Sequence, residues 1–230
     1  MALGPRPLAH ASAGRGLTVI AVALLVIALT AASAEALDVG LGPYRQAAQA
    51  SEVGVVTGHV YEESRKPGGP VKPLTGAAVA LLPRSEALLT SLGRFKEDAR
   101  GSSKAFTAAA PAMRRAQEAL ERELVQAGAP DLAPRAGVGT DGTFRITDVP
   151  AGAWLVLVWH STTQEVSASK SSGREGNLYQ LPGRTTGFQA VTVWMREITV
   201  ASGQTVSLDL NDRNEWFRGV IEDKRRDAGR

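Results

Sequence analysis

Short stretches in which apolar and polar residues alternate recur over residues 54–212, separated by turn sequences rich in glycine, proline and aspartate. A period of two with many β-branched residues is typical of strands that bury one face. Stretches of this kind cover residues 54–61, 74–82, 143–147, 189–200 and 205–210. Residues 154–159 are apolar on both faces, which predicts a central strand covered on both sides. Roughly six or seven short strands favour an antiparallel β-sandwich over a helical or parallel-sheet fold.

Residues at the predicted turns and in the predicted core support this fold. The turn residues are Gly76, Asp141, Gly142, Pro150 and Gly152. Glycine adopts backbone angles that other residues avoid, and an Asp-Gly pair suits a tight hairpin. We expect the large rings of Phe144 and Trp154 to fill the core.

Residues 84–136 interrupt the alternation and predict a helical insertion. Ser85 is placed to cap a helix with apolar residues at helical spacing, and a second helix follows with Pro111 near its start. The apolar stripes consist of Leu88, Leu92 and Phe95 in the first helix, and Met113, Ala116, Leu120 and Leu124 in the second. Such stripes favour a helical hairpin that covers one sheet face. A partner-docking arm is the alternative, since long insertions often carry function.

The segments around the strands give weaker patterns. Residues 37–53 have no clear period and are predicted to be a linker into the first strand. Residues 161–188 form a long polar loop rich in serine and glycine, and loops of this length are often functional. Residues 213–230 place four apolar side chains at helix-like spacing before a run of mixed charges. We expect a C-terminal helical turn there, followed by a charged tail.

The first 36 residues have the layout of a signal peptide. A leader with Arg6, Arg15 and no acidic residue precedes an apolar run over residues 17–32, and small residues then end two cleavage patterns at Ala34 and Ala36. The apolar run is shorter than the roughly 20 residues needed to span a bilayer. An uncleaved anchor is the alternative. The prediction is a periplasmic or secreted protein without a membrane span after cleavage.

Composition narrows the candidate chemistry. The formal net charge is only +3, from 26 basic and 23 acidic residues, and this balance gives no electrostatic reason to expect nucleic acid as a partner. The chain has no cysteine, which excludes disulfides, thiolate metal sites and cysteine nucleophiles. Motifs for phosphate loops, dinucleotides and serine nucleophiles are missing from the sequence. We therefore predict no cofactor, no metal and no catalytic residue.

Four segments together resemble a known family. They are 58–61 (GHVY), 73–81 (PLTGAAVAL), 140–146 (TDGTFRI) and 149–152 (VPAG). As a set they are similar to the carboxypeptidase regulatory-like domain, which belongs to the transthyretin-like (prealbumin-like) group of Ig-like sandwiches. The resemblance implies a seven-stranded antiparallel sandwich, here with the helical hairpin inserted between its second and third strands. It also implies an accessory, noncatalytic role.

The resemblance leaves one enzymatic alternative and four weak candidates for binding. Hydrolases of the transthyretin-like group carry a histidine where His59 stands, but this chain lacks their C-terminal Tyr-Arg-Gly-Ser sequence. The binding candidates are Trp159, Tyr179, Arg184 and Trp194. The two tryptophans are candidates to stack on a sugar or peptide from an open sheet face, although Trp194 also fits a core position. We predict an exported, noncatalytic module that binds an envelope protein or a glycan, with a hydrolase or a structural subunit docking through its hairpin as alternatives.

Overall fold

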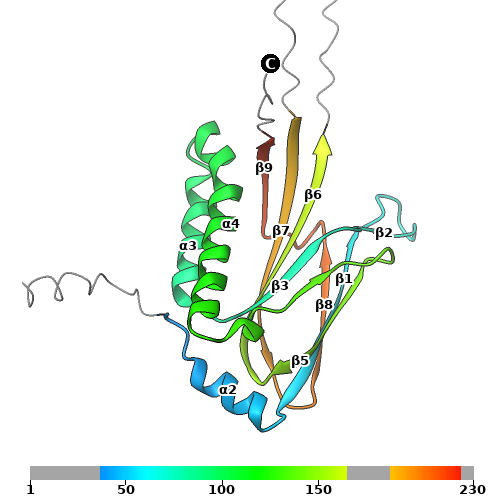
Figure 1. Ribbon diagram of the computed structural model, residues 1–230. Helices are drawn as coiled ribbons and strands as arrows, with labels where there is room; N and C mark the ends of the chain where they lie inside the picture. The colour runs from blue at the N-terminus through cyan, green and yellow to red at the C-terminus, as the bar shows by residue number, and fades with distance from the viewer. Residues whose placement is uncertain (1–36, 165–186, 224–230) are drawn as a thin grey trace, which may run out of the picture. The chain divides into compact units, whose positions relative to one another are not determined.

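The predicted strands form two layered sheets in a computed structural model, which describes residues 37–164 and 187–223 (Figure 1). Several predictions fall outside the described residues. They are the signal peptide with Ala34 and Ala36, the loop residues Tyr179 and Arg184, and the charged tail at 224–230.

Nine strands make up the sheets of the described residues. The first sheet holds β1 (Val53–Glu62), β2 (Lys72–Pro73), β5 (Thr143–Pro150) and β8 (Thr205–Asn211). The second sheet holds, in spatial order, β4 (Arg135–Gly137), β3 (Ala78–Pro83), β6 (Gly152–Gln164), β7 (Gly187–Val200) and β9 (Phe217–Asp223). The protein is therefore mainly β, with two sheets and several helices.

The strand count and one pairing differ from the predicted seven-stranded antiparallel arrangement. Two of the additional strands, β2 and β4, are only two and three residues long. β8 pairs parallel with β1, while the other strand pairs are antiparallel. The reason is the connection 201–204, which carries the chain from β7 in the second sheet to β8 in the first. A strand that arrives from another sheet is not constrained to run antiparallel to its neighbour, as a hairpin partner is.

The core lies between the sheets and beneath the helices. Val56, Val60 and Phe144 of the first sheet are buried, and so are Trp154 and Trp194 of the second. Every residue from 154 to 159 is buried, which confirms the prediction that this strand is covered on both sides. One cover is the first sheet and the other is the helical insertion.

The insertion forms two helices, as predicted. α3 (Glu86–Asp98) and α4 (Ser103–Gln126) lie side by side along the second sheet (Figure 1). Ser85 caps α3, because its Oγ accepts a hydrogen bond from the Leu88 N–H at 3.0 Å. The predicted apolar stripes are buried or partly buried at Leu88, Leu92, Phe95, Met113, Ala116, Leu120 and Leu124. The stripes therefore cover the sheet and are not an open docking surface.

Pro111 does not stand near a helix start. Ser102 caps α4, since its Oγ accepts a hydrogen bond from the Ala105 N–H at 3.1 Å, and the helix runs on through Pro111. The short 3₁₀ helix η1 (Pro130–Leu132) then leads into β4.

The segment predicted as a linker contains a helix, α2 (Leu41–Gln49). The Tyr44 ring meets Trp154 edge to face with centroids 5.1 Å apart, and its hydroxyl donates to the Ala153 carbonyl. Asp38 accepts a hydrogen bond from the Ala87 N–H at 2.7 Å, near the start of α3. The helix is held by contacts with residues distant in sequence, which local periodicity cannot reveal.

The C-terminal segment also differs from its prediction, because it forms the edge strand β9 instead of a helical turn. β9 pairs with β7 from Gly187↔Asp223 to Val193↔Phe217. Gly219 lies close to Ala110 of α4, so the strand is held between the edge of β7 and the helix. This pairing outweighs the helix-like spacing of the apolar residues.

The predicted turn residues have the expected backbone conformations. Gly76, Gly142 and Gly152 have φ values of 74°, 80° and 156°. Asp141 accepts hydrogen bonds from the Thr143 N–H and hydroxyl, which lowers its pKa. This turn joins β4 of one sheet to β5 of the other, so it is not the predicted hairpin between paired strands. Pro150 contributes the carbonyl that accepts the Trp154 indole N–H at 2.9 Å.

Candidate functional site

The two candidate tryptophans do not form an open platform. Trp194 is only 1% exposed, and its indole N–H crosses between the sheets to donate to the Asn211 carbonyl at 2.8 Å. Trp159 is 6% exposed and lies on the opposite face of the sheet, beneath α4. Neither ring is therefore an exposed stacking surface, because the first sheet covers Trp194 and α4 covers Trp159, and Trp194 occupies the core position that its sequence also allowed. Trp159 nevertheless lines a groove at the margin of the helical cover.

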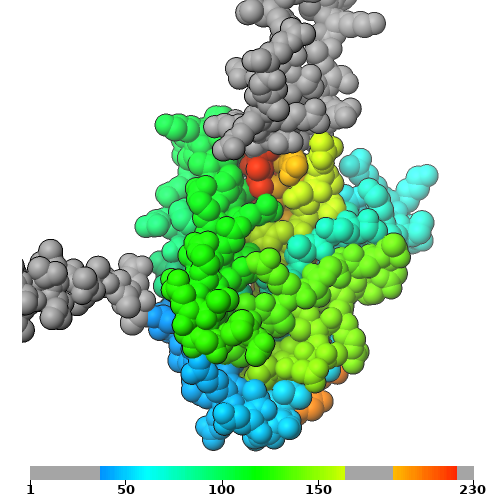
Figure 2. Space-filling view, in the orientation of Figure 1, coloured from blue at the N-terminus to red at the C-terminus, as the bar shows by residue number. Residues whose placement is uncertain are grey.

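The groove runs beside α4 at the β3–β4 end of the second sheet and has a volume of about 320 Å³. This face is turned toward the viewer in Figure 2. Its floor is β3, where Ala78 and Ala80 pair with Trp159 and Leu157 and so share their helix-side face. The walls are Arg114, Gln117 and Glu118 of α4 on one side and Arg135 of β4 on the other.

The local sequence explains why this part of the sheet is hollowed. α4 packs against β9 at the far edge of the sheet and against η1 at its own C-terminal end. β3 lies beside the helix instead of beneath it. At the groove, the side chains that β3 presents on this face are Ala78 and Ala80, which leave the space unfilled, whereas Leu82 follows on the same face outside the groove. A floor of small side chains allows a ligand to approach the strand backbone closely.

A chain of hydrogen bonds joins the α4 wall to β6 and to Arg135 of the opposite wall. The Trp159 indole N–H donates to Gln117 Oε1 at 2.7 Å, and Gln117 Nε2 donates to Glu121 Oε1 at 2.9 Å. Glu121 accepts a further bond from Arg135. Gln117 is 7% exposed, so these bonds satisfy a polar side chain that is almost fully buried. The network holds β6, α4 and β4 in one geometry before any ligand arrives.

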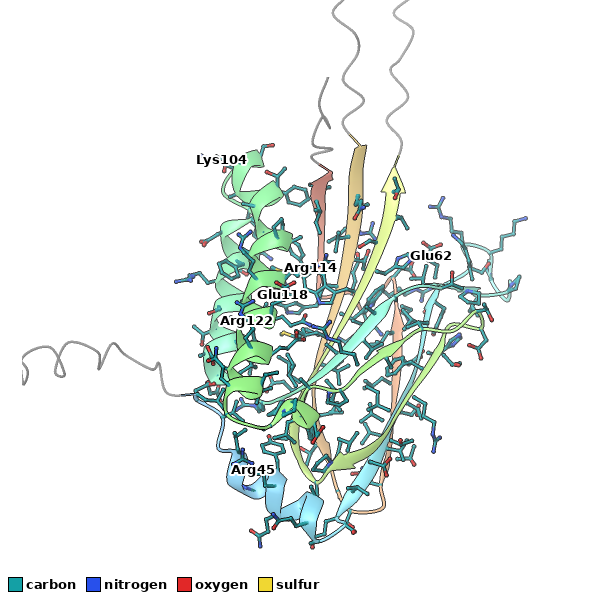
Figure 3. All side chains as sticks on the ribbon, viewed as in Figure 1. Arg45, Glu62, Lys104, Arg114, Glu118 and Arg122 are labelled. Carbon is teal, nitrogen blue, oxygen red and sulfur yellow. The ribbon has the colours of Figure 1, made fainter. Side chains whose placement is uncertain are left out.

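Two charged side chains on the same wall are available to a ligand. The Arg114 guanidinium lies over the Trp159 ring, with Cζ 5.3 Å from the ring centroid. Arg114 and Glu118 stand at i,i+4 spacing on α4, which would suit an ion pair. Within the described residues, however, neither side chain takes part in a hydrogen bond or ion pair. Figure 3 shows Arg114, Glu118 and Arg122 following one another along α4. The groove therefore offers planar guanidinium donors one helical turn away from a carboxylate acceptor.

The charges around the groove cancel. Arg114 and Arg135 are balanced by Glu118 and Glu121, and the Glu121 side chain is only 12% exposed in its ion pair with Arg135. A balanced site gives no net attraction for an anion or a cation. It suits an uncharged ligand that exchanges several hydrogen bonds at once.

The two histidines of the described residues belong to different sheets. His59 stacks on Tyr61 with ring centroids 4.7 Å apart on the first sheet, whereas His160 belongs to the second sheet. Burial lowers the pKa of His160. Over residues 37–164 and 187–223, no group of three or more histidine or carboxylate side chains is arranged to hold a metal ion. The helices of the same residues are too short or too polar to cross a bilayer.

Comparisons with known proteins give distant similarities only. No protein-family model and no curated protein matches the chain. A crystal structure of a Pseudomonas aeruginosa protein proposed to bind carbohydrate is 16% identical, with a TM-score of 0.36 over 75% of this chain and 99% of that one. The pilus backbone protein of Streptococcus pneumoniae is 12% identical, with a TM-score of 0.19 over 44% and 29% of the two chains. These similarities carry no functional argument, so the proposed function is argued from the residues that line the groove.

Proposed function

We propose that the protein is an exported, noncatalytic β-sandwich module that binds an uncharged glycan in the groove between α4 and β3. The observation that carries the proposal is the pair Arg114 and Glu118 above the alanine floor and beside Trp159, since neither side chain makes a hydrogen bond or ion pair among the described residues. Neighbouring sugar hydroxyls both donate and accept hydrogen bonds. A guanidinium donor one turn from a carboxylate acceptor matches two such hydroxyls.

The size of the groove favours a glycan over a protein partner. Small-molecule sites enclose about 300–1,000 Å³, whereas a stable protein interface buries at least about 1,000 Å² of surface. The groove is at the lower end of the first range. The helical pair offers little apolar surface for docking, because its stripes already face the sheet.

Sequence patterns support the remaining parts of the proposal. The charged leader, the short apolar run and the small residues at Ala34 and Ala36 favour export to the periplasm or beyond. The resemblance to carboxypeptidase regulatory-like domains favours a prealbumin-like sandwich with an accessory role.

Binding to defined neutral oligosaccharides tests the proposal. Cello-, xylo-, malto- and chito-oligosaccharides would be titrated calorimetrically against the protein and against Arg114→Gln and Ala78→Leu. Ala78 is exposed, so a leucine there should block the groove without disturbing the core. The matched control is Arg115→Gln, an exposed neighbour on α4 that does not line the groove.

We expect one series to bind. Arg114→Gln should weaken its affinity by about tenfold or more, since one lost charged hydrogen bond is worth about 1.5–3 kcal/mol. Ala78→Leu should weaken it by about tenfold or more as well, because the larger side chain occupies the groove. Arg115→Gln should bind like the unmodified protein. The proposal is wrong if no neutral series binds, or if Ala78→Leu binds as tightly as the protein it derives from.

A further inference from the structure

A second hollow adjoins the groove along α4. It has a volume of about 360 Å³ and is lined by Glu118, Glu121, Arg122, Val125 and Gln126. Glu118 lines both hollows. The two spaces therefore border the same side chain of α4.

The residues that line the two hollows form one stripe on the helix. Positions 114, 117, 118, 121, 122, 125 and 126 are spaced by three and four residues, so their side chains follow one another along one side of α4. From Arg114 to Val125 the helix rises about 16 Å, at about 1.5 Å per residue. This length exceeds that of a single sugar ring.

The second hollow has its own chemistry for a sugar. Val125 is 59% exposed, more than Phe106, the other large apolar side chain of α4 that reaches solvent at 36%. Arg122 and Gln126 flank it with hydrogen-bond donors and an acceptor. A pyranose ring has an apolar face of C–H groups and a rim of hydroxyls. Val125 fits the apolar face and its polar neighbours fit the rim.

We infer that the second hollow is a further subsite for the same glycan, so that the ligand is an oligosaccharide of two or more units lying along α4. This inference rests on the proposed function. Glu118 lies at the junction, where it can accept hydrogen bonds from either unit. A single sugar would use only the groove, and a longer chain would add the contacts at Arg122 and Val125.

Titration with oligosaccharides of increasing length tests the inference. The cello-, xylo-, malto- and chito-oligosaccharides from one to six units would be measured against the full chain and against Arg122→Gln/Val125→Asn. Both changed side chains are exposed, so folding should be preserved and would be checked by circular dichroism. Val71→Asn is the control, because Val71 is a similarly exposed valine, 45% accessible, that lines neither hollow.

In the series that binds, we expect affinity to rise about tenfold from one to three units. The double variant should lose most of that gain and keep the affinity for the single sugar, and Val71→Asn should change neither. Equal affinity for one and three units would refute the second subsite and leave the glycan proposal intact. The same holds if the double variant keeps the full gain. If no series binds at any length, the proposed function itself fails, and the inference fails with it.

Discussion

The hydrogen bond between Trp159 and Gln117 can be tested by replacing Gln117 with leucine. Leucine has a similar volume and high helix propensity, so it should fill the same space on α4 without leaving a cavity. It cannot accept the indole N–H, which now meets its acceptor at 2.7 Å in an almost fully buried position. It also removes the donor to Glu121, which keeps its bond from Arg135.

The expected cost follows from the donor that loses its partner. A buried polar group without a hydrogen bond costs about 1–3 kcal/mol, so Gln117→Leu should lower the free energy of unfolding by about 2 kcal/mol. Trp159→Phe should cost more, because it leaves the Gln117 oxygen without its donor and also removes part of a buried ring. Replacing both partners removes the unmet donor and the unmet acceptor together. The double variant should therefore be about 1–2 kcal/mol more stable than the sum of the single changes predicts.

Urea unfolding followed by circular dichroism measures all four proteins of this cycle. The slope of the transition should stay the same in each, since the surface exposed on unfolding hardly changes. Additivity within about 0.4 kcal/mol would mean that the two side chains do not share a stabilising hydrogen bond. In that case the groove wall would not be held as described.

Three further changes have defined outcomes. Ser85→Ala should lower the free energy of unfolding by about 1 kcal/mol, because it removes the side-chain cap of α3, and thermal unfolding that is unchanged would contradict this role. Gly142→Ala should destabilise by more than about 1 kcal/mol in urea unfolding, because φ is 80° and a Cβ would lie 2.7 Å from the Val60 carbonyl oxygen. Burial lowers the pKa of His160, so the unfolded chain binds the imidazole proton more readily than the folded chain does. The free energy of unfolding should therefore fall as the pH drops below about 6.5. His160→Asn should flatten that pH dependence. An equally steep pH profile for this variant would assign the effect to other groups.

The sheet strands could be predicted because alternation is a local signal. Residues 54–61 and 205–210 show which side chains face inward without reference to any partner. α2 and β9 could not be predicted in this way. α2 is held by the contact of Tyr44 with Trp154, more than a hundred positions away, and β9 exists because β7 offers it a free edge. Interactions between distant segments decided both.

Part of the site was also present in the sequence. A strand that is apolar on both faces should be covered on both faces, so the pattern at 154–159 already favoured burial of Trp159 over an open platform. Gln117 stands between Met113 and Leu120 on the apolar side of the predicted helix. A polar side chain in such a stripe indicates a buried hydrogen-bond partner, and the structure shows that this partner is Trp159. The alanines of β3, in contrast, gave no sign that the space above them stays open.

The position of the insertion explains how the groove forms. The chain leaves the sheet at the end of β3, builds α3 and α4, and returns through β4, which pairs with β3 from Ala78↔Gly137 to Ala80↔Arg135. The two ends of the insertion are therefore joined to the same strand. Because β4 pairs beside β3, Arg135 faces α4 across the alanine floor. The helical pair is thus both the cover of β6 and one wall of the groove, so a deletion of residues 84–136 would expose the core and would not separate binding from folding.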